Sequence, residues 1–181
     1  MNASKRKILA ISGSTRIRST NESILRIIAE TYNEWIDVEL FDGIAKLPHF
    51  NPDIDDDHVE TSVKDFREKI EHADGVIICT PEYVFSLPGS LKNAIEWTVS
   101  TTVFSDKPAA LIVASGLGEK AYESLILVMK TVGANMGDST LLIKGARSKL
   151  NALGQISDQS VLQDIDSVMK SFMKTIDDRV V

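Results

Sequence analysis

The stretch VIICTPEYVFSLPGSLKNAIEW, residues 76–97, decides the fold class of this chain. Its first part, Val76–Thr80, is a short and almost continuously apolar run, which is typical of a strand buried on both faces of a parallel sheet. A turn with two prolines follows. Pro88 suits the first turn of a helix, where its missing N–H costs little, and we expect that helix to run from about Pro88 to Trp97.

The same alternation of apolar runs and helical segments extends along the chain in both directions. Further short apolar runs lie at Ile8–Ser12, Val38–Phe41, Ala109–Ser115 and Leu141–Ile143. The segments between them carry apolar stripes at helical spacing: Ile24, Ile28 and Trp35; Val63, Phe66 and Ile70; Ala121, Leu125, Val128 and Val132; Val161, Ile165, Val168, Phe172 and Ile176. This pattern predicts an α/β fold with a parallel sheet and helices on both of its faces.

Length, charge and cysteine content limit what the protein can be. A chain of 181 residues fits a single domain, residues 1–181, and the net charge of -6 argues against nucleic acid or an anionic membrane as a partner. The single cysteine, Cys79, excludes an intrachain disulfide, and the histidines show no metal-ligand spacing. No stretch approaches the roughly 18 apolar residues of a membrane helix. We therefore expect a cytoplasmic protein with no metal site.

The loop after the first strand has the composition of a phosphate site. It reads SGSTRIRSTNE, residues 12–22, and leads into a helix whose N-terminus offers free N–H groups and the positive end of a dipole. Arg16 adds a cation that can pair with phosphate. The neutral donors are Ser14, Ser19, Thr20 and Asn21. The loop lacks both G-x-x-x-x-G-K-[ST] and G-x-G-x-x-G, so a terminal phosphomonoester suits it better than a triphosphate or a dinucleotide. An ordinary capped helix is the alternative.

Two more loops follow the third and fourth strands. The turn TPEYVFSLPG, residues 80–89, is rigid enough for its backbone to lie against a flat ring, and the glycines of SGLGEKA, residues 115–121, let a ligand approach closely. Phe50 and Phe85 are candidates for the rim. Each loop alone also describes a structural turn. In the strand order 2-1-3-4-5, however, strands one, three and four are neighbours, and ligands bind at their carboxyl ends. A phosphate cradle beside two ring-sized loops describes an FMN site.

At these residues the sequence closely resembles the NAD(P)H-dependent FMN reductase family, which includes bacterial quinone, chromate and azo-dye reductases. The family pattern G-S-x-R-x-x-S-x-N is matched at residues 13–21. The longer pattern T-P-E-Y-N-x-S-x-P-G-x-L-K-N-A-I-[DE]-W is matched at residues 80–97, except that Val84 replaces the asparagine. The resemblance extends from about Lys7 to Asp138, and the second pattern is long and specific.

The resemblance implies a flavodoxin-like fold, tightly bound FMN and a homodimer or homotetramer. It assigns the phosphate to the first loop and the ring to the other two, and Val84 removes an amide contact near the ring. The predicted cofactor-binding residues are Ser14, Arg16, Ser19, Thr20, Asn21, Pro81, Glu82, Tyr83, Val84, Phe85, Ser115 and Gly116.

The implied activity is that of an NAD(P)H-dependent FMN oxidoreductase. NADPH or NADH passes a hydride to the flavin, and a small acceptor such as a quinone then takes the electrons in a ping-pong mechanism. Because the flavin carries this chemistry, no catalytic side chain is predicted. Two other functions fit the residues: a flavodoxin-type electron carrier, and a flavin-binding regulatory protein without turnover. The sequence does not choose between possible acceptors, between NADPH and NADH, or between dimer and tetramer.

Overall fold

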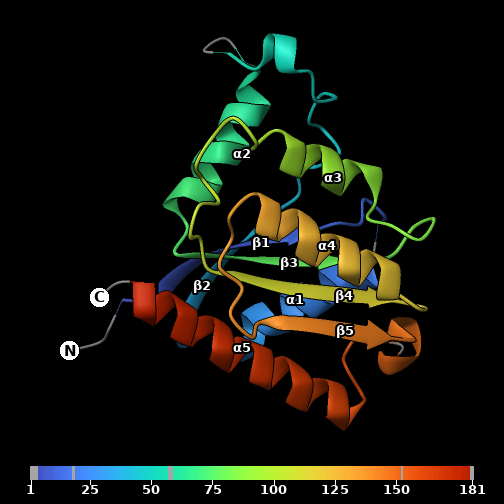
Figure 1. Ribbon diagram of the computed structural model, residues 1–181. Coiled ribbons are helices and arrows are strands. Elements are labelled where there is room, and N and C mark those ends of the chain that lie inside the picture. The colour runs from blue at the N-terminus through green and yellow to red at the C-terminus, as the bar shows by residue number, and fades with distance from the viewer. Residues whose placement is uncertain (1–3, 18, 57–58, 152, 180–181) are drawn as a thin grey trace.

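The computed structural model describes residues 4–17, 19–56, 59–151 and 153–179. Its centre is a parallel sheet of five strands in the order β2-β1-β3-β4-β5 (Figure 1), which confirms the predicted flavodoxin-like order. The strands are β1 (Arg6–Ser12), β2 (Ile36–Phe41), β3 (Gly75–Thr80), β4 (Ala109–Ser115) and β5 (Thr140–Lys144). All five match the apolar runs of the sequence, with ends that differ by one or two residues.

Helices cover both faces of this sheet, as the alternation predicts. They are α1 (Thr20–Thr31), α2 (Thr61–His72), α3 (Gly89–Glu96), α4 (Glu119–Thr131) and α5 (Gln159–Arg179), with two short 3₁₀ helices, η1 (Pro52–Ile54) and η2 (Ala146–Lys149). In Figure 1, α2, α3 and α4 lie above the sheet and α5 lies below it, while both chain ends are at the left. The carboxyl ends of the strands, and hence the predicted site, are at the right.

Each face of the sheet has its own core, and the alternation of side chains along the strands divides the residues between them. Leu9, Val76 and Leu111 pack with α2, α3 and α4. Ile8 and Ile77 pack with α1 and α5 on the opposite face. All residues of β3 are buried, which explains why its sequence is apolar throughout and does not alternate.

The long connection between β2 and α2 is tied down by an arginine. Arg67 of α2 donates from Nε to the Trp97 carbonyl oxygen at 2.6 Å and from its guanidinium to Asp55 Oδ1 at 2.6 Å. Burial raises the pKa of the Asp55 carboxyl, but hydrogen bonds from Ser100 and Arg67 outweigh it and leave the pKa below 3.8. Because Asn93 of α3 also donates to the Pro48 carbonyl oxygen at 2.9 Å, the connection has fixed partners on two helices.

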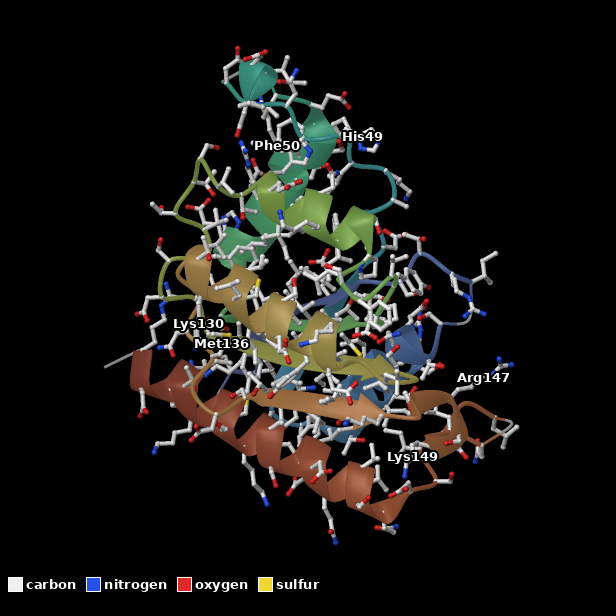
Figure 2. All side chains as sticks on the ribbon, turned by 45° about the vertical axis from the view of Figure 1, so that its right-hand side comes forward. His49, Phe50, Lys130, Met136, Arg147 and Lys149 are labelled. Atoms are coloured by element: carbon white, nitrogen blue, oxygen red, sulfur yellow. The ribbon has the colours of Figure 1, made fainter. Side chains whose placement is uncertain are left out.

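Two aromatic side chains, Trp35 and Phe50, lie outside the helix stripe and against a neighbouring indole, respectively. Trp35 continues the helical stripe by a step of seven from Ile28, yet α1 ends at Thr31 and the indole is exposed. The chain turns at Tyr32, whose carbonyl accepts the Trp35 N–H at 2.9 Å, so Trp35 belongs to the turn before β2. Phe50 packs edge-on against Trp97 with ring centres 5.1 Å apart, in the upper part of the molecule (Figure 2), and its place at the flavin rim stays a prediction.

Candidate functional site

The loops after β1 and β3 are joined where the two strands end. The Gly13 N–H donates to the Cys79 carbonyl at 2.8 Å, which continues the ladder by one step beyond β1. A Cβ at position 13 would lie 2.1 Å from Thr80 Oγ1 and 2.9 Å from a Leu91 methyl group, so only glycine fits there. The first loop therefore leaves the sheet in close contact with β3.

The first loop ends at the N-terminus of α1, as the phosphate hypothesis requires. Ser19 is the N-cap, and its Oγ accepts the Asn21 N–H at 3.2 Å. The side chain of Ser14 is half-buried, and its Oγ accepts the Arg16 N–H at 3.3 Å. The Arg16 side chain is exposed. Helix dipole, hydroxyl groups and a guanidinium thus lie within one short segment, and all of them favour a bound anion.

A groove of about 1240 Å³ opens around this segment. Four predicted phosphate residues line it, namely Ser14, Arg16, Ser19 and Thr20. The remaining walls include residues that the sequence analysis did not single out: Leu40, Phe41, Asp42, Ile44, Ala45, Arg147, Leu150, Asn151, Leu153 and Gly154. Arg147 extends outward at the same end of the molecule as the predicted site (Figure 2), so a second arginine is available to an anion in the groove.

Asn21 differs from its predicted neighbours because its buried side chain is bonded to the sheet. Its Oδ1 accepts a hydrogen bond from the Cys79 thiol at 3.3 Å, and the residue lies on the sheet side of α1. Asn21 is three residues before Ile24 and seven before Ile28, so the apolar stripe of the helix already indicated this orientation. The Asn21 amide oxygen thus joins α1 to β3, and a contact of this residue with phosphate stays a prediction.

The turn between β3 and α3 is fastened to β4 and α4. Pro81 is buried, and the Glu82 N–H donates to Ser115 Oγ at 3.2 Å. Glu82 Oε2 accepts the backbone N–H groups of Lys120 at 2.9 Å and Ala121 at 3.0 Å. Because the N-cap of α4 is Gly118 and has no side-chain cap, this carboxylate caps the helix from a different loop. The sequence pattern assigns Glu82 to the ring and gives no sign of this contact.

The tip of the same turn is a two-residue hairpin. Tyr83 and Ser86 exchange backbone hydrogen bonds of 3.0 and 3.1 Å, and the two residues between them have positive φ, 52° at Val84 and 55° at Phe85. This is the pattern of a type I′ turn, in which asparagine and glycine are the favoured residues. The asparagine of the resembling pattern suits position 84 for this reason, whereas valine is strained there.

The structure brings the predicted ring residues together in one group and the phosphate residues in another. The first group comprises Pro81–Phe85, Ser115 and Gly116, joined by the Glu82–Ser115 bond. The second, apart from Asn21, lines the groove at α1. Both groups lie at the carboxyl edge of the sheet, and the Gly13–Cys79 bond connects them. The residues of the first group do not line the groove itself.

The comparisons with known proteins agree with this arrangement. Residues 6–147 match the family described as NADPH-dependent FMN reductase. The chain belongs to this family. It is accordingly an oxidoreductase with FMN as cofactor and NAD(P)H as cosubstrate. The flavodoxin-like architecture carries the three loops of the site, in agreement with the fold expected from the sequence.

Several known proteins are similar to this FMN reductase over most of their length. The NADH:(hydroxy)cinnamate reductase subunit CrdA of Vibrio ruber is 34% identical over 172 residues, 91% of this chain and 84% of the relative. The NADH-dependent flavin reductase subunit 2 of Lactobacillus johnsonii is 32% identical, covering 94% and 97%. Among solved structures, the flavoenzyme NAD(P)H:(acceptor) oxidoreductase FerB of Paracoccus denitrificans is 26% identical, with a TM-score of 0.78 and coverage of 96% and 98%.

The residues present fit FMN on observations of this structure alone. The α1 cradle supplies uncharged donors and a guanidinium for a phosphate. At Gly116 an added Cβ would meet no atom within 4 Å, so the backbone after β4 faces open space that a ring can fill. The two features are far apart in the sequence, and the fold brings them to the same edge of the sheet.

Other kinds of site receive no support from the side chains. Within the described residues no group of three or more His, Cys, Asp or Glu could hold a metal ion. None of the helices in the described part of the chain is both long and apolar enough to cross a membrane. Burial strongly raises the pKa of the Cys79 thiol, which keeps it protonated and unreactive.

Proposed function

We propose that the protein is a ping-pong reductase that takes electrons from NAD(P)H and passes them to a small, flat acceptor such as a quinone. The observation that carries the proposal is the donor set at α1, where Ser14, Arg16 and the Ser19 cap line a groove beside the loops of β3 and β4. When bound, FMN supplies the two-electron chemistry that links the nicotinamide to the acceptor.

The protein's own part is to hold and orient. Arg16 and the N-terminus of α1 would bind the phosphate, because both favour an anion. The Pro81–Tyr83 backbone would support one side of the ring, held in place by the Glu82 contacts with Ser115 and α4. Ser115 and Gly116 would border the other side. No side-chain proton transfer is needed in this scheme.

The direct test is anaerobic reduction of the purified protein. We expect a yellow protein whose flavin absorbance is bleached by NADPH or NADH and restored by menadione. Comparing the two nucleotides also gives the cosubstrate preference. A colourless protein that FMN cannot reconstitute would exclude the proposal. Bleaching only in the presence of a separate reductase would favour an electron carrier, and bound flavin without acceptor reduction would favour a regulatory protein.

A second candidate is that the chain works as the flavin-reducing subunit of a larger enzyme. The specific observation is that two relatives similar along almost the whole chain are themselves described as subunits. In that case a partner protein receives the electrons. Copurification of a stoichiometric partner with the native protein, together with slow turnover of quinones by the isolated chain, would favour this function over the first.

For the isolated protein we further propose a homodimer or homotetramer in the cytoplasm. The support is the family to which the chain belongs and the exposed side chain of Leu127 on α4. Light scattering coupled to gel filtration measures the oligomeric state, and a monomer at micromolar concentration would contradict the proposal. Fractionation of the source cells tests the compartment.

A further inference from the structure

The tip of the β3–α3 turn, Val84 and Phe85, combines an unfavourable backbone conformation with exposed apolar side chains. We propose that it selects the electron acceptor, and that it favours flat, uncharged, apolar acceptors such as quinones over hydrated anions. The proposal rests on the function proposed above and names the class of its second substrate. It concerns side chains whose presence neither packing nor backbone preference explains.

The backbone of the tip is in the left-handed conformation. Val84 has φ 52° and Phe85 has φ 55°. Positive φ is uncommon for any residue other than glycine and is a true outlier for a β-branched or bulky one. Asparagine or glycine would satisfy the same hairpin without strain. The identities at positions 84 and 85 therefore oppose the local folding preference.

Both side chains of the tip are also exposed. Val84 is 95% exposed and Phe85 is 72% exposed, so neither side chain gains stability from burial within the chain. Leu117, two residues after β4, is 61% exposed, and its loop is joined to this turn through the Glu82–Ser115 bond. Strained residues cluster where function needs them, and adjacent exposed apolar residues mark contact surfaces.

The tip is also held in position. Its base is closed by the two bonds between Tyr83 and Ser86, and the flanking Leu87 and Pro88 are buried. Glu82 anchors the other side on α4. Because the base of the turn is bonded on both sides, Val84 and Phe85 stay exposed at the carboxyl edge of the sheet, where the proposed ring site lies. A ligand meets a preformed apolar surface there and does not have to order it.

The charge distribution defines the ligand class. No residue from Tyr83 to Leu91 carries a formal charge, and the carboxylate of Glu82 is engaged by the N-terminus of α4. An uncharged planar molecule that lies over the ring loses water from its apolar edge against Val84 and Phe85, which favours binding. A hydrated anion gains nothing from this apolar contact, and the tip carries no cation that could pair with it.

The test compares two acceptors in Val84→Asn, with menadione as the apolar acceptor and ferricyanide as the anion. We expect the ratio of kcat/KM for menadione to that for ferricyanide to fall by roughly tenfold, the scale of a lost apolar contact. Menadione binding to the oxidised holoprotein without NAD(P)H, followed by calorimetry, should weaken by about the same factor. The apoprotein should melt about 2–4 °C higher, because asparagine relieves the strain.

Two further variants show whether a lower acceptor ratio in Val84→Asn comes from the lost apolar side chain or from the added amide. Val84→Gly relieves the strain without adding an amide, so it should lower the ratio as Val84→Asn does. Val99→Asn makes the same substitution at another exposed valine, 57% exposed, whose φ is not positive, so it should change neither the ratio nor the melting temperature.

An unchanged acceptor ratio and unchanged menadione binding in both Val84 variants would overturn the proposal. A change of oligomeric state in Val84→Asn would also overturn it, since the tip would then be an interface between copies of the chain. If NAD(P)H does not reduce the wild-type protein, the proposed function itself fails. Normal turnover with an unchanged ratio rejects the acceptor proposal alone.

Discussion

Replacement of Glu82 tests whether one carboxylate joins two loops of the site. Glu82 Oε2 accepts two backbone N–H groups at the start of α4, at 2.9 Å and 3.0 Å, where Gly118 offers no cap of its own. Loss of a helix cap costs about 1 kcal/mol, and a hydrogen bond to a charged group is worth about 1.5–3 kcal/mol. We therefore expect Glu82→Ala to lower the free energy of unfolding by about 2 kcal/mol. Glu82→Gln keeps an acceptor oxygen and should cost about 1 kcal/mol.

Urea unfolding of the apoprotein measures this difference, because bound flavin would add its own stabilisation. The midpoint should fall without a change in slope, and the melting temperature of Glu82→Ala should drop by about 4–8 °C. Glu123→Gln is the matched control: it removes an exposed carboxylate from the same helix without touching the cap, and the midpoint should stay the same. Equal unfolding free energies for wild type and Glu82→Ala would refute the reasoning.

Three other predictions concern the cradle, the long connection and the thiol. Arg16→Ala should weaken FMN binding by roughly 1.5–3 kcal/mol, because one charge-assisted contact is lost; an unchanged Kd in a fluorescence titration of the apoprotein would count against Arg16. The pKa of Asp55 in the folded protein lies below 3.8, so the ionised carboxylate stabilises the fold above pH 3.8, and this stabilisation is lost as the pH falls through the pKa of the folded state. The difference in unfolding free energy between wild type and Asp55→Asn should therefore become smaller below pH 3.8, which acid unfolding curves measure. Cys79 is buried with a raised pKa, so DTNB at pH 8 should label it only after denaturation, and rapid labelling of the folded protein would contradict its burial.

The sheet could be predicted because its signal is local. Each strand is a short apolar run, and β3 and β4 are apolar throughout since helices cover both of their faces. The parallel order then places the loops of β1, β3 and β4 at one edge. The error at Trp35 came from a stripe that continues in register after the helix has ended, and periodicity alone does not show where a helix stops.

The site was only partly predictable because its contacts join residues far apart in the sequence. Glu82 and Ala121 belong to different loops, and no pattern relates them before the fold brings them together. The residues of the groove near Arg147 also come from a segment without a motif. Asn21 is a different case: its position on the apolar stripe of α1 carried the signal, and its polar side chain led the interpretation toward phosphate.

The close fit of Gly13 against Thr80 has a consequence for protein engineering. Because the start of the phosphate loop rests on the end of the neighbouring strand with no room for even a methyl group, the two segments form a matched pair. Chimeras that graft one of them from a relative, leaving the other native, should misfit at this seam. Swaps that move residues 12–21 and 79–91 together preserve it, so these segments are the natural exchangeable unit for building hybrid enzymes on this scaffold.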